Sequence, residues 1–224
     1  MFARRTAALA AAGLFALVLG GTAGAEDAPL DIKIPKPAFS RTPKDLPPGL
    51  GRLERPTGKP RPPFLAPKGC RNLALNRPAT SSDPEPIIGK LEQVTDGDKE
   101  GVEGSWVELG PGKQWVQIDL GEQVQIYAII VWHNHSEARV YKGVVVQVSD
   151  NGINHVQTVF NNDQDNSVGL GIGEDLQYFE NNEGKLIDTR GVKGRYVRLW
   201  SKGNTTDDQN HYTEVEVWGI PTAK

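Results

Sequence analysis

Short stretches in the second half of the chain alternate between apolar and polar residues with a period of two. They span residues 115–120, 124–132, 144–148, 156–160, 195–200 and 213–218. This period is typical of β-strands, and the chain lacks long amphipathic patterns with a helical period. Ser149-Asp150-Asn151-Gly152 places an Asn-Gly turn between two of the stretches, which indicates a hairpin. Many short strands separated by Gly- and Asn-rich turns predict an all-β sandwich or barrel.

The stretch from 124 to 132 is apolar on both of its faces. Its even-numbered residues, Val124 to Trp132, are predicted to share one face, and its odd-numbered residues, continuing to His133, the other. Both faces are therefore expected to be mostly buried, as in a central strand of a sandwich.

The first 25 residues have the pattern of a cleavable signal peptide. Arg4 and Arg5 precede an apolar run that ends at Leu19, and the small residues 23–25 stand before Glu26. The run is short for a bilayer core of about 30 Å, which argues against a membrane anchor. We therefore expect a secreted, periplasmic or cell-envelope protein that has no transmembrane segment after cleavage.

Residues 26–68 differ in composition from the rest of the chain. They hold eleven of its sixteen prolines and only two aromatic residues, Phe39 and Phe64. Such a stretch offers little apolar surface to offset the entropy lost on ordering. It predicts a disordered, partly polyproline linker that holds a folded domain, residues 69–221, away from its surroundings.

The charge balance excludes one class of partner. Residues 26–68 carry nine Lys and Arg against five Asp and Glu, whereas residues 69–224 carry fourteen against twenty-three. An acidic folded part repels phosphate, so we expect no nucleic-acid partner.

Cys70 is the only cysteine and forms no internal disulfide. An intermolecular bridge, a free thiol and a small buried residue stay open for it.

Six sequence phrases follow one another in a fixed order between residues 72 and 219. They are residues 72–74 with 80–82, 94–97, 115–121, 146–152, 195–199 and 214–219, which read NLA with TSS, VTDG, WVQIDLG, VQVSDNG, RYVRL and EVEVWG. Together they resemble the coagulation factor 5/8 type C, or discoidin, domain. The resemblance implies a jelly-roll β-sandwich of about eight main strands. It also implies a galactose-binding-like class in which ligands meet the loops at one end.

The same resemblance implies a structural calcium ion, held by an Asp-Gly loop and a Glu near the C-terminal strand. The matching positions are Asp96 and Glu214, with Asp98 beside them. Calcium takes six to eight oxygen ligands, commonly carboxylates and backbone carbonyls. The alternative is that Asp96 only caps a turn and Glu214 is solvated.

A second oxygen-rich segment has the spacing of a calcium loop at Asp163, Asp165, Ser167, Gly169 and Glu174. The match is incomplete, because Val168 stands where such a loop has glycine and no flanking helices are evident. Metal binding and a polar loop without metal both stay open here.

A cluster of polar and aromatic residues follows the apolar stretch and recurs in later loops. Its members are His133, His135, Arg139, Asn204, Asn210, His211 and Tyr212. In sugar-binding relatives, such groups at loop ends bond to hydroxyls and stack on the sugar ring. We expect a carbohydrate site here, and the alternative is a set of solvated loop residues.

Catalytic motifs are absent from the sequence. It has no nucleophile elbow, Gly-rich phosphate loop or cysteine-based site. A cupin-like metal site fits poorly, since Glu137 follows His135 too closely and no second histidine motif occurs. We therefore predict an exported, non-catalytic module that binds carbohydrate or an envelope polymer. A protein-interaction or structural module of the cell envelope is the alternative.

Overall fold

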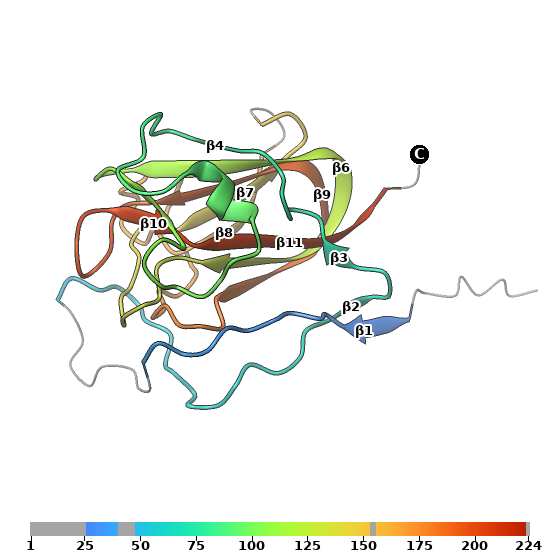
Figure 1. The fold of residues 1–224 in the computed structure, drawn as a ribbon, viewed down its shortest axis with the longest axis horizontal. Coiled ribbons are helices and arrows are strands. Elements are labelled where there is room, and N and C mark those ends of the chain that lie inside the picture. Colours follow the sequence, from blue (N-terminus) through green and yellow to red (C-terminus); the bar gives the residue numbers. More distant parts are fainter. Residues whose placement is uncertain (1–25, 40–47, 153–155, 223–224) are drawn as a thin grey trace, which may run out of the picture.

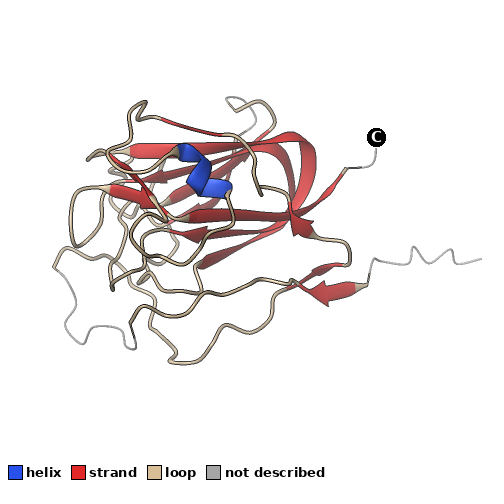
Figure 2. Cartoon of the chain, viewed as in Figure 1, coloured by secondary structure: helices blue, strands red, loops and turns tan. Residues whose placement is uncertain are grey.

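The computed structural model describes residues 26–39, 48–152 and 156–222. Within these residues the chain forms eleven strands and one short 3-10 helix (Figures 1 and 2). The elements are β1 (Asp27–Pro29), β2 (Leu65–Pro67), β3 (Arg71–Asn72), β4 (Ala79–Ser81), η1 (Leu91–Thr95), β5 (Val107–Leu109), β6 (Gln114–Trp132), β7 (Val145–Ser149), β8 (Gln157–Asn161), β9 (Lys185–Ser201), β10 (Asn210–Tyr212) and β11 (Glu214–Pro221). The predicted all-β class is confirmed.

Two long strands, β6 and β9, bend so that each contributes to both layers of the sandwich. The first half of β6 pairs with β4 and with the second half of β9, which in turn pairs with β7 and then β8. The second half of β6 pairs with β11 and with the first half of β9, and β3 adds to β11. All these pairings are antiparallel. The predicted stretches 115–120 and 124–132 therefore form one strand, whose bend is visible at the right of Figure 1.

The main core fills the space between these two layers. Val116 and Ile118 come from the first half of β6, and Val197 and Leu199 from β9. From the other layer, residues of β11 and the second half of β6 meet them in the same cluster. The alternation of buried and half-buried residues along the first half of β6 thus reflects one face on the core and one toward solvent.

A β-bulge corrects the face assignment predicted for residues 124–132. Opposite this stretch, β9 carries a wider bulge in which Arg190 and Gly191 take positive φ angles of 52° and 77°. Against β11, β6 has one residue more, because β6 advances from Ile126 to Ala128 while β11 moves only from Gly219 to Trp218. One extra residue reverses the side-chain alternation beyond it. Val124 and Ile126 therefore belong to the main core, whereas the even-numbered residues from Ala128 to Trp132 belong to a separate cluster with Trp218.

The described parts of residues 26–68 cover this second cluster, so the prediction of a detached linker is wrong for them. Leu30, Ile32 and Phe64 pack against the apolar outer face of β6 and β11. β1 and β2 pair with each other and close this segment at its base, seen at the lower right of Figure 1. Composition hid this contact because three well-placed apolar side chains suffice to anchor a proline-rich chain to a sheet face.

Two further expectations concern the chain's termini and membranes. The predicted signal peptide, residues 1–25, lies outside the described residues. Among the described residues, no helix is both long and apolar enough to cross a membrane.

Cys70 precedes β3, is half-buried and is free of disulfide bonding, and burial raises the pKa of its thiol.

Candidate functional site

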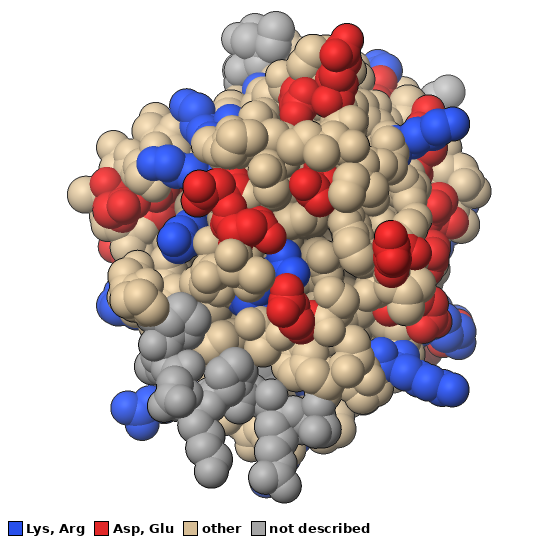
Figure 3. Space-filling view, turned by 60° about the vertical axis from the view of Figure 1, so that its left-hand side comes forward, with Lys and Arg blue, Asp and Glu red and all other residues tan. Residues whose placement is uncertain are grey.

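The bends of β6 and β9 bring many loops to one end of the sandwich, called here the loop end. Both ends of β6 and both ends of β9 lie there, while the bends lie at the opposite end (Figure 1). The connections 133–144, 162–184 and 202–209 therefore gather at the loop end. Figure 3 turns this side toward the viewer and shows acidic side chains over much of its centre, with basic ones between and around them.

A buried polar chain runs through this end and contains two of the predicted ligand residues. His133 donates from Nδ1 to Glu180 Oε1 at 2.6 Å and stacks on Tyr141 at 4.2 Å between ring centroids. The Tyr141 hydroxyl donates to His211 Nδ1 at 2.8 Å, and His211 Nε2 lies 3.3 Å from a carboxylate oxygen of Glu108. Burial lowers the pKa of His211 to about 4, so the ring is neutral near pH 7.

The other predicted residues from the 202–212 region join the same buried layer. Asn210 accepts from Ser201 and Gly203 and donates to the carbonyls of Gly110 and Gly112. Burial raises the pKa of Tyr212 far above its usual range, and its hydroxyl bonds to the Leu199 carbonyl at 3.2 Å.

Arg139 and Asn204 meet at one acidic side chain. Arg139 Nη1 lies 3.3 Å from Asp207, and Asn204 Nδ2 donates to Asp207 at 2.6 Å. Arg139 also pairs with Glu137. These contacts hold the 133–144 and 202–209 connections together.

His135 points to a different part of the loop end. Its Nε2 donates to the backbone carbonyl of Lys99 at 2.9 Å, and its ring packs so tightly on Gly101 that a Cβ there would lie 2.5 Å away. His135 therefore braces the 96–101 loop.

The structure thus brings the predicted cluster together but buries it. No member exposes more than 4% of its surface. The alternative of a set of solvated loop residues is wrong, because the connections fold back over the sandwich and cover their own polar groups. A part in ligand binding, acting through the layer above, stays a prediction for these seven residues.

The predicted calcium loop lies beside Glu214. The carboxylate of Glu214 is fully buried, and its Oε2 accepts the backbone N–H of Gly97 at 3.0 Å. Its Oε1 is buried without a hydrogen-bond partner. Burial, together with the nearby charges of Glu216 and Asp96, raises the pKa of Glu214 to about 9. An unpartnered buried carboxylate oxygen fits a neighbouring cation.

The two aspartates of this loop differ in their availability. Asp98 uses both oxygens within the loop, accepting from Glu100 N and from the Ser105 hydroxyl. Asp96 is exposed and accepts from Asp98 N through Oδ1. Among the described residues, no group of three or more His, Cys, Asp and Glu side chains is arranged to hold a metal. Backbone carbonyls would have to complete a calcium site here.

The second oxygen-rich segment is occupied by its own hydrogen bonds. Asp163 is buried and accepts from the backbone N–H groups of Ser167 and Val168 and from the Ser167 hydroxyl. Asp165 accepts from Ser167 N as well. This pattern is that of a polar loop braced by aspartate turns.

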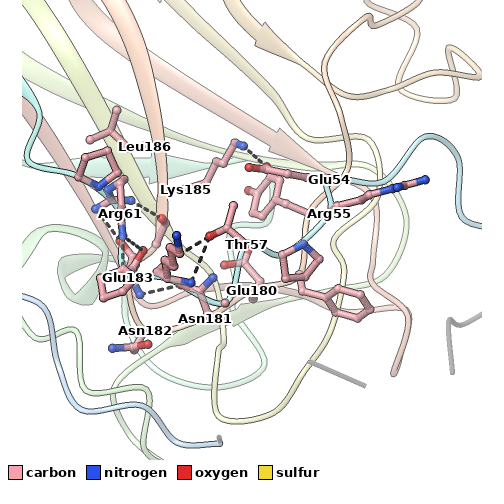
Figure 4. Close-up of a pocket in the computed structure, with 18 of the residues that line it drawn as sticks. Glu54, Arg55, Thr57, Arg61, Glu180, Asn181, Asn182, Glu183, Lys185 and Leu186 are labelled. Carbon is pink, nitrogen blue, oxygen red and sulfur yellow. Dashed lines mark hydrogen bonds and ion pairs between the residues drawn. The ribbon is translucent and has the colours of Figure 1, made fainter. Parts of the chain in front are cut away.

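A hollow of about 640 Å³ opens between residues 54–62 and residues 178–186 (Figure 4). Arg61 fixes one side of it by donating to the carbonyls of Glu183 and Gly184 at 3.0 and 2.8 Å. Lys185 reaches Glu54 at 2.6 Å and lies 4.9 Å from the ring centroid of Tyr178. This volume falls within the usual range of small-ligand sites.

The hollow and the buried cluster share one residue. Glu180 lines the hollow and also holds His133. The residues predicted from the sequence therefore lie at the end of the sandwich where the hollow opens, but in the buried layer beneath it. It missed Glu54 and Arg61, since both lie in the segment assigned to a linker. The only signal for them was the presence of apolar residues such as Phe64 among the prolines.

The arrangement of the strands agrees with a known family of domains. A family model described as F5/8 type C domain matches residues 78–216, which is more than half of the chain. The chain belongs to the F5/8 type C family. The resemblance drawn from the six sequence phrases is thereby confirmed, and the F5/8 type C match leaves out residues 26–68.

Solved structures share the fold of this F5/8 type C domain. A variant of chitosan-binding module 1 from a chitosanase/glucanase of Paenibacillus sp. IK-5 matches with a TM-score of 0.50 and 21% identity, covering 67% of this chain and 99% of that one. A family 89 glycoside hydrolase from Clostridium perfringens matches with a TM-score of 0.51 and 16% identity, covering 67% of this chain and 15% of the hydrolase. No curated protein sequence matches the chain.

Proposed function

We propose that this F5/8 type C domain is a non-catalytic module that binds carbohydrate in the hollow at its loop end. The hollow is the observation that carries the proposal. Polar side chains such as Glu54, Asn181 and Lys185 line it together with the rings of Tyr178 and Phe179. Sugars present hydroxyls that bond to polar groups and ring faces that pack on aromatic side chains, so this mixture suits them.

The fold relatives support carbohydrate as the class of ligand. The Paenibacillus module is named for binding chitosan, and the C. perfringens chain is a glycoside hydrolase.

The pattern of residues 1–25 supports an exported protein that meets extracellular or envelope glycans. N-terminal sequencing of the exported form should give a start at Glu26. A start at Met1 or Phe2 would contradict export by cleavage.

We also propose that a calcium ion stabilises the domain beside Glu214. Glu214 would supply its buried oxygen, and Asp96 with backbone carbonyls of the same loop would supply others. Calcium contributes charge compensation for a buried carboxylate and rigidity for the loop. His135, which braces this loop through Lys99, links the calcium loop to the rest of the loop end.

A glycan array tests the carbohydrate proposal, with the exported chain used whole and probed with and without calcium. The whole chain is needed because residues 54–62 form one wall of the hollow. Glu54→Ala should weaken binding of any glycan found by about tenfold, the usual effect of one lost hydrogen bond to a charged group. Glu122→Ala is the matched control, because Glu122 is exposed at the opposite end, in the bend of β6.

Two results would overturn this proposal. One is an array on which the folded chain binds no glycan. The other is equal binding by Glu54→Ala, Glu122→Ala and the unaltered chain. A folded domain without glycan ligands would favour the protein-interaction or structural role in the cell envelope.

A further inference from the structure

The outer face of the first layer carries an ordered set of aromatic, amide and cationic side chains. Along β6 and β9 the alternate residues Trp115, Gln117, Arg198 and Trp200 are half-buried, whereas their neighbours lie in the core. Register pairs Trp115 with Trp200, and Arg198 with Gln117 on one side and Gln147 on the other. These side chains therefore stand in two adjacent rows across a solvent-facing sheet. We call this surface the tryptophan face.

Arg198 is held firmly in the middle of the tryptophan face. Its guanidinium lies 4.4 Å from the ring centroid of Trp115 and 5.8 Å from that of Trp200. Its Nε donates to Gln117 at 2.9 Å, and Trp200 donates to Gln147 at 3.0 Å. Stacking and one hydrogen bond fix the plane of the guanidinium, so little side-chain entropy is left to lose on binding.

This cation lacks a carboxylate partner among the described residues. Arg195, on the same strand, forms a two-pronged pair with Asp119 at 2.6 and 2.7 Å. None of the hydrogen bonds among the described residues uses the two terminal nitrogens of Arg198. Burial lowers the pKa of its guanidinium, with no carboxylate opposing the change. A partly desolvated cation without a counter-ion is costly, and an anionic ligand would relieve that cost.

Two lysines extend the positive charge toward the loop end. Lys113 lies 5.6 Å from the ring centroid of Trp200 and donates to the Val168 carbonyl at 3.0 Å. Lys202 is directed to the neighbouring carbonyl of Ser167. Neither lysine forms an ion pair among the described residues. The tryptophan face is thus locally positive in a domain whose overall balance is acidic.

We propose that the tryptophan face binds the uronate units of an acidic polysaccharide. The planar fork of Arg198 matches the two oxygens of a carboxylate. The amides of Gln117 and Gln147 offer partners to ring hydroxyls, and the indoles offer apolar surface to the sugar. An open sheet face with side chains in rows suits an extended polymer better than a small isolated molecule. This site is separate from the hollow at the loop end, so an experiment can disprove either of the two proposed sites without affecting the other.

Affinity electrophoresis through gels containing polygalacturonate tests this proposal, with the exported chain used whole. A matched gel contains the same polymer as its methyl ester, which keeps the sugar but removes the charge. A chelator is added to both gels, because calcium cross-links polygalacturonate and would bridge it to acidic side chains. The chain should be retarded by polygalacturonate, retarded far less by the ester, and released as salt rises.

Arg198→Gln should weaken the apparent affinity for polygalacturonate at least tenfold. Arg198→Lys keeps the positive charge and the aliphatic part of the side chain but loses the planar guanidinium. Its affinity should lie between those of Arg198→Gln and the unaltered chain. Arg190→Gln is the matched control, since it removes the same charge from an exposed side chain at the bend of β9. Thermal unfolding of each variant establishes that it is folded.

Equal retardation by the polymer and its ester would overturn the proposal, as would no retardation by either. Equal loss in Arg198→Gln and Arg190→Gln would mean that only net charge matters, and would also overturn it. Loss of glycan binding in Glu54→Ala with retained binding to polygalacturonate would separate this site from the hollow.

Discussion

Glu214 accepts the backbone N–H of Gly97 through one carboxylate oxygen, while its other oxygen is equally buried and has no partner. The contact joins β11 to the loop after η1 across more than a hundred residues of sequence. It also places an ionisable group where its charged form is disfavoured, and burial raises the pKa of Glu214 to about 9.

Without metal, this carboxyl should make stability fall as pH rises. A raised folded-state pKa gives a contribution that is complete below the unfolded value of about 4.5 and is lost as pH approaches about 9. In chelator, Glu214→Gln should therefore remove part of the decline in melting temperature between pH 6 and 9. Glu92→Gln, at an exposed position in η1, is the control and should follow the unaltered chain.

Calcium should reverse this trend, because the ion binds the deprotonated carboxylate. At a free concentration of 100 times its dissociation constant, a single bound ion stabilises the native state by about 2.7 kcal/mol. The calcium-dependent rise in melting temperature should grow with pH and disappear in Glu214→Gln. A melting curve that does not change with calcium or chelator at pH 8 would rule out the site.

Phe64 should contribute to stability although it lies among prolines. It packs against the second cluster on the outer face of β6 and β11. Because the ring is half-buried, Phe64→Ala should cost about 1–3 kcal/mol, less than the loss of a fully buried ring. Leu65→Ala is the control, since Leu65 is 57% exposed and should change stability by less than about 0.5 kcal/mol. Urea unfolding measures both.

Deletion of residues 26–68 should produce an aggregation-prone domain. The deletion uncovers Ala128, Ile130 and Trp132, which now lie beneath Leu30, Ile32 and Phe64. An exposed apolar sheet face should bind a hydrophobic dye and self-associate. Limited proteolysis offers an independent check, because the described part of this segment should resist cleavage nearly as well as the sandwich. Rapid removal that leaves a soluble, stable core would contradict the packing.

Arg139 should matter for folding as well as for any ligand. Its side chain is 5% exposed and pairs with both Glu137 and Asp207. Arg139→Ala should destabilise the domain by about 2–4 kcal/mol, because it removes the common partner of two acidic side chains. The control Arg190→Ala alters a side chain that is 89% exposed and should have little effect. An unchanged melting temperature for Arg139→Ala would mean that the pairing contributes nothing.

His211 should make the domain lose stability in mild acid. Burial lowers the pKa of its imidazole from 6.5 to about 4. A lowered folded-state pKa gives stability that is complete above about 6.5 and is lost as pH falls toward about 4. The slope of unfolding free energy against pH reports how many protons are taken up on unfolding. In this window His211→Gln should reduce that uptake by up to one proton. Parallel slopes for the two proteins would show that His211 titrates normally.

The sequence was most informative where one face of a strand meets the core. Period-two alternation located β7, β8 and β11 to within a residue or two at the start of each strand, and the first two pair antiparallel as the predicted hairpin requires. It did not locate residues 185–194 of β9, where glycines and charged residues accompany the bend. Nor did it reveal the bulge near Tyr127, since a reversal of faces leaves no trace in a stretch that is apolar on both.

The site was harder to predict, because residue type does not determine depth. His133 and Arg139 have the chemistry of sugar-binding groups, yet the connections around them turn inward and bury both. Glu54 and Lys185 lie 131 residues apart and meet only because the proline-rich segment returns along the sandwich. Such a contact depends on tertiary packing of a segment without a periodic pattern.

The pairing of β1 with β2 also determines how the domain would respond to mechanical load. The backbone carbonyl of Glu26 accepts from Lys68 N, so the start of the segment lies beside the point where the chain enters the sandwich. A pull on the chain end at Glu26 would therefore act at the end of an antiparallel pair and open its hydrogen bonds one after another. The segment would detach from the sandwich at low force and extend before the sandwich itself bore tension.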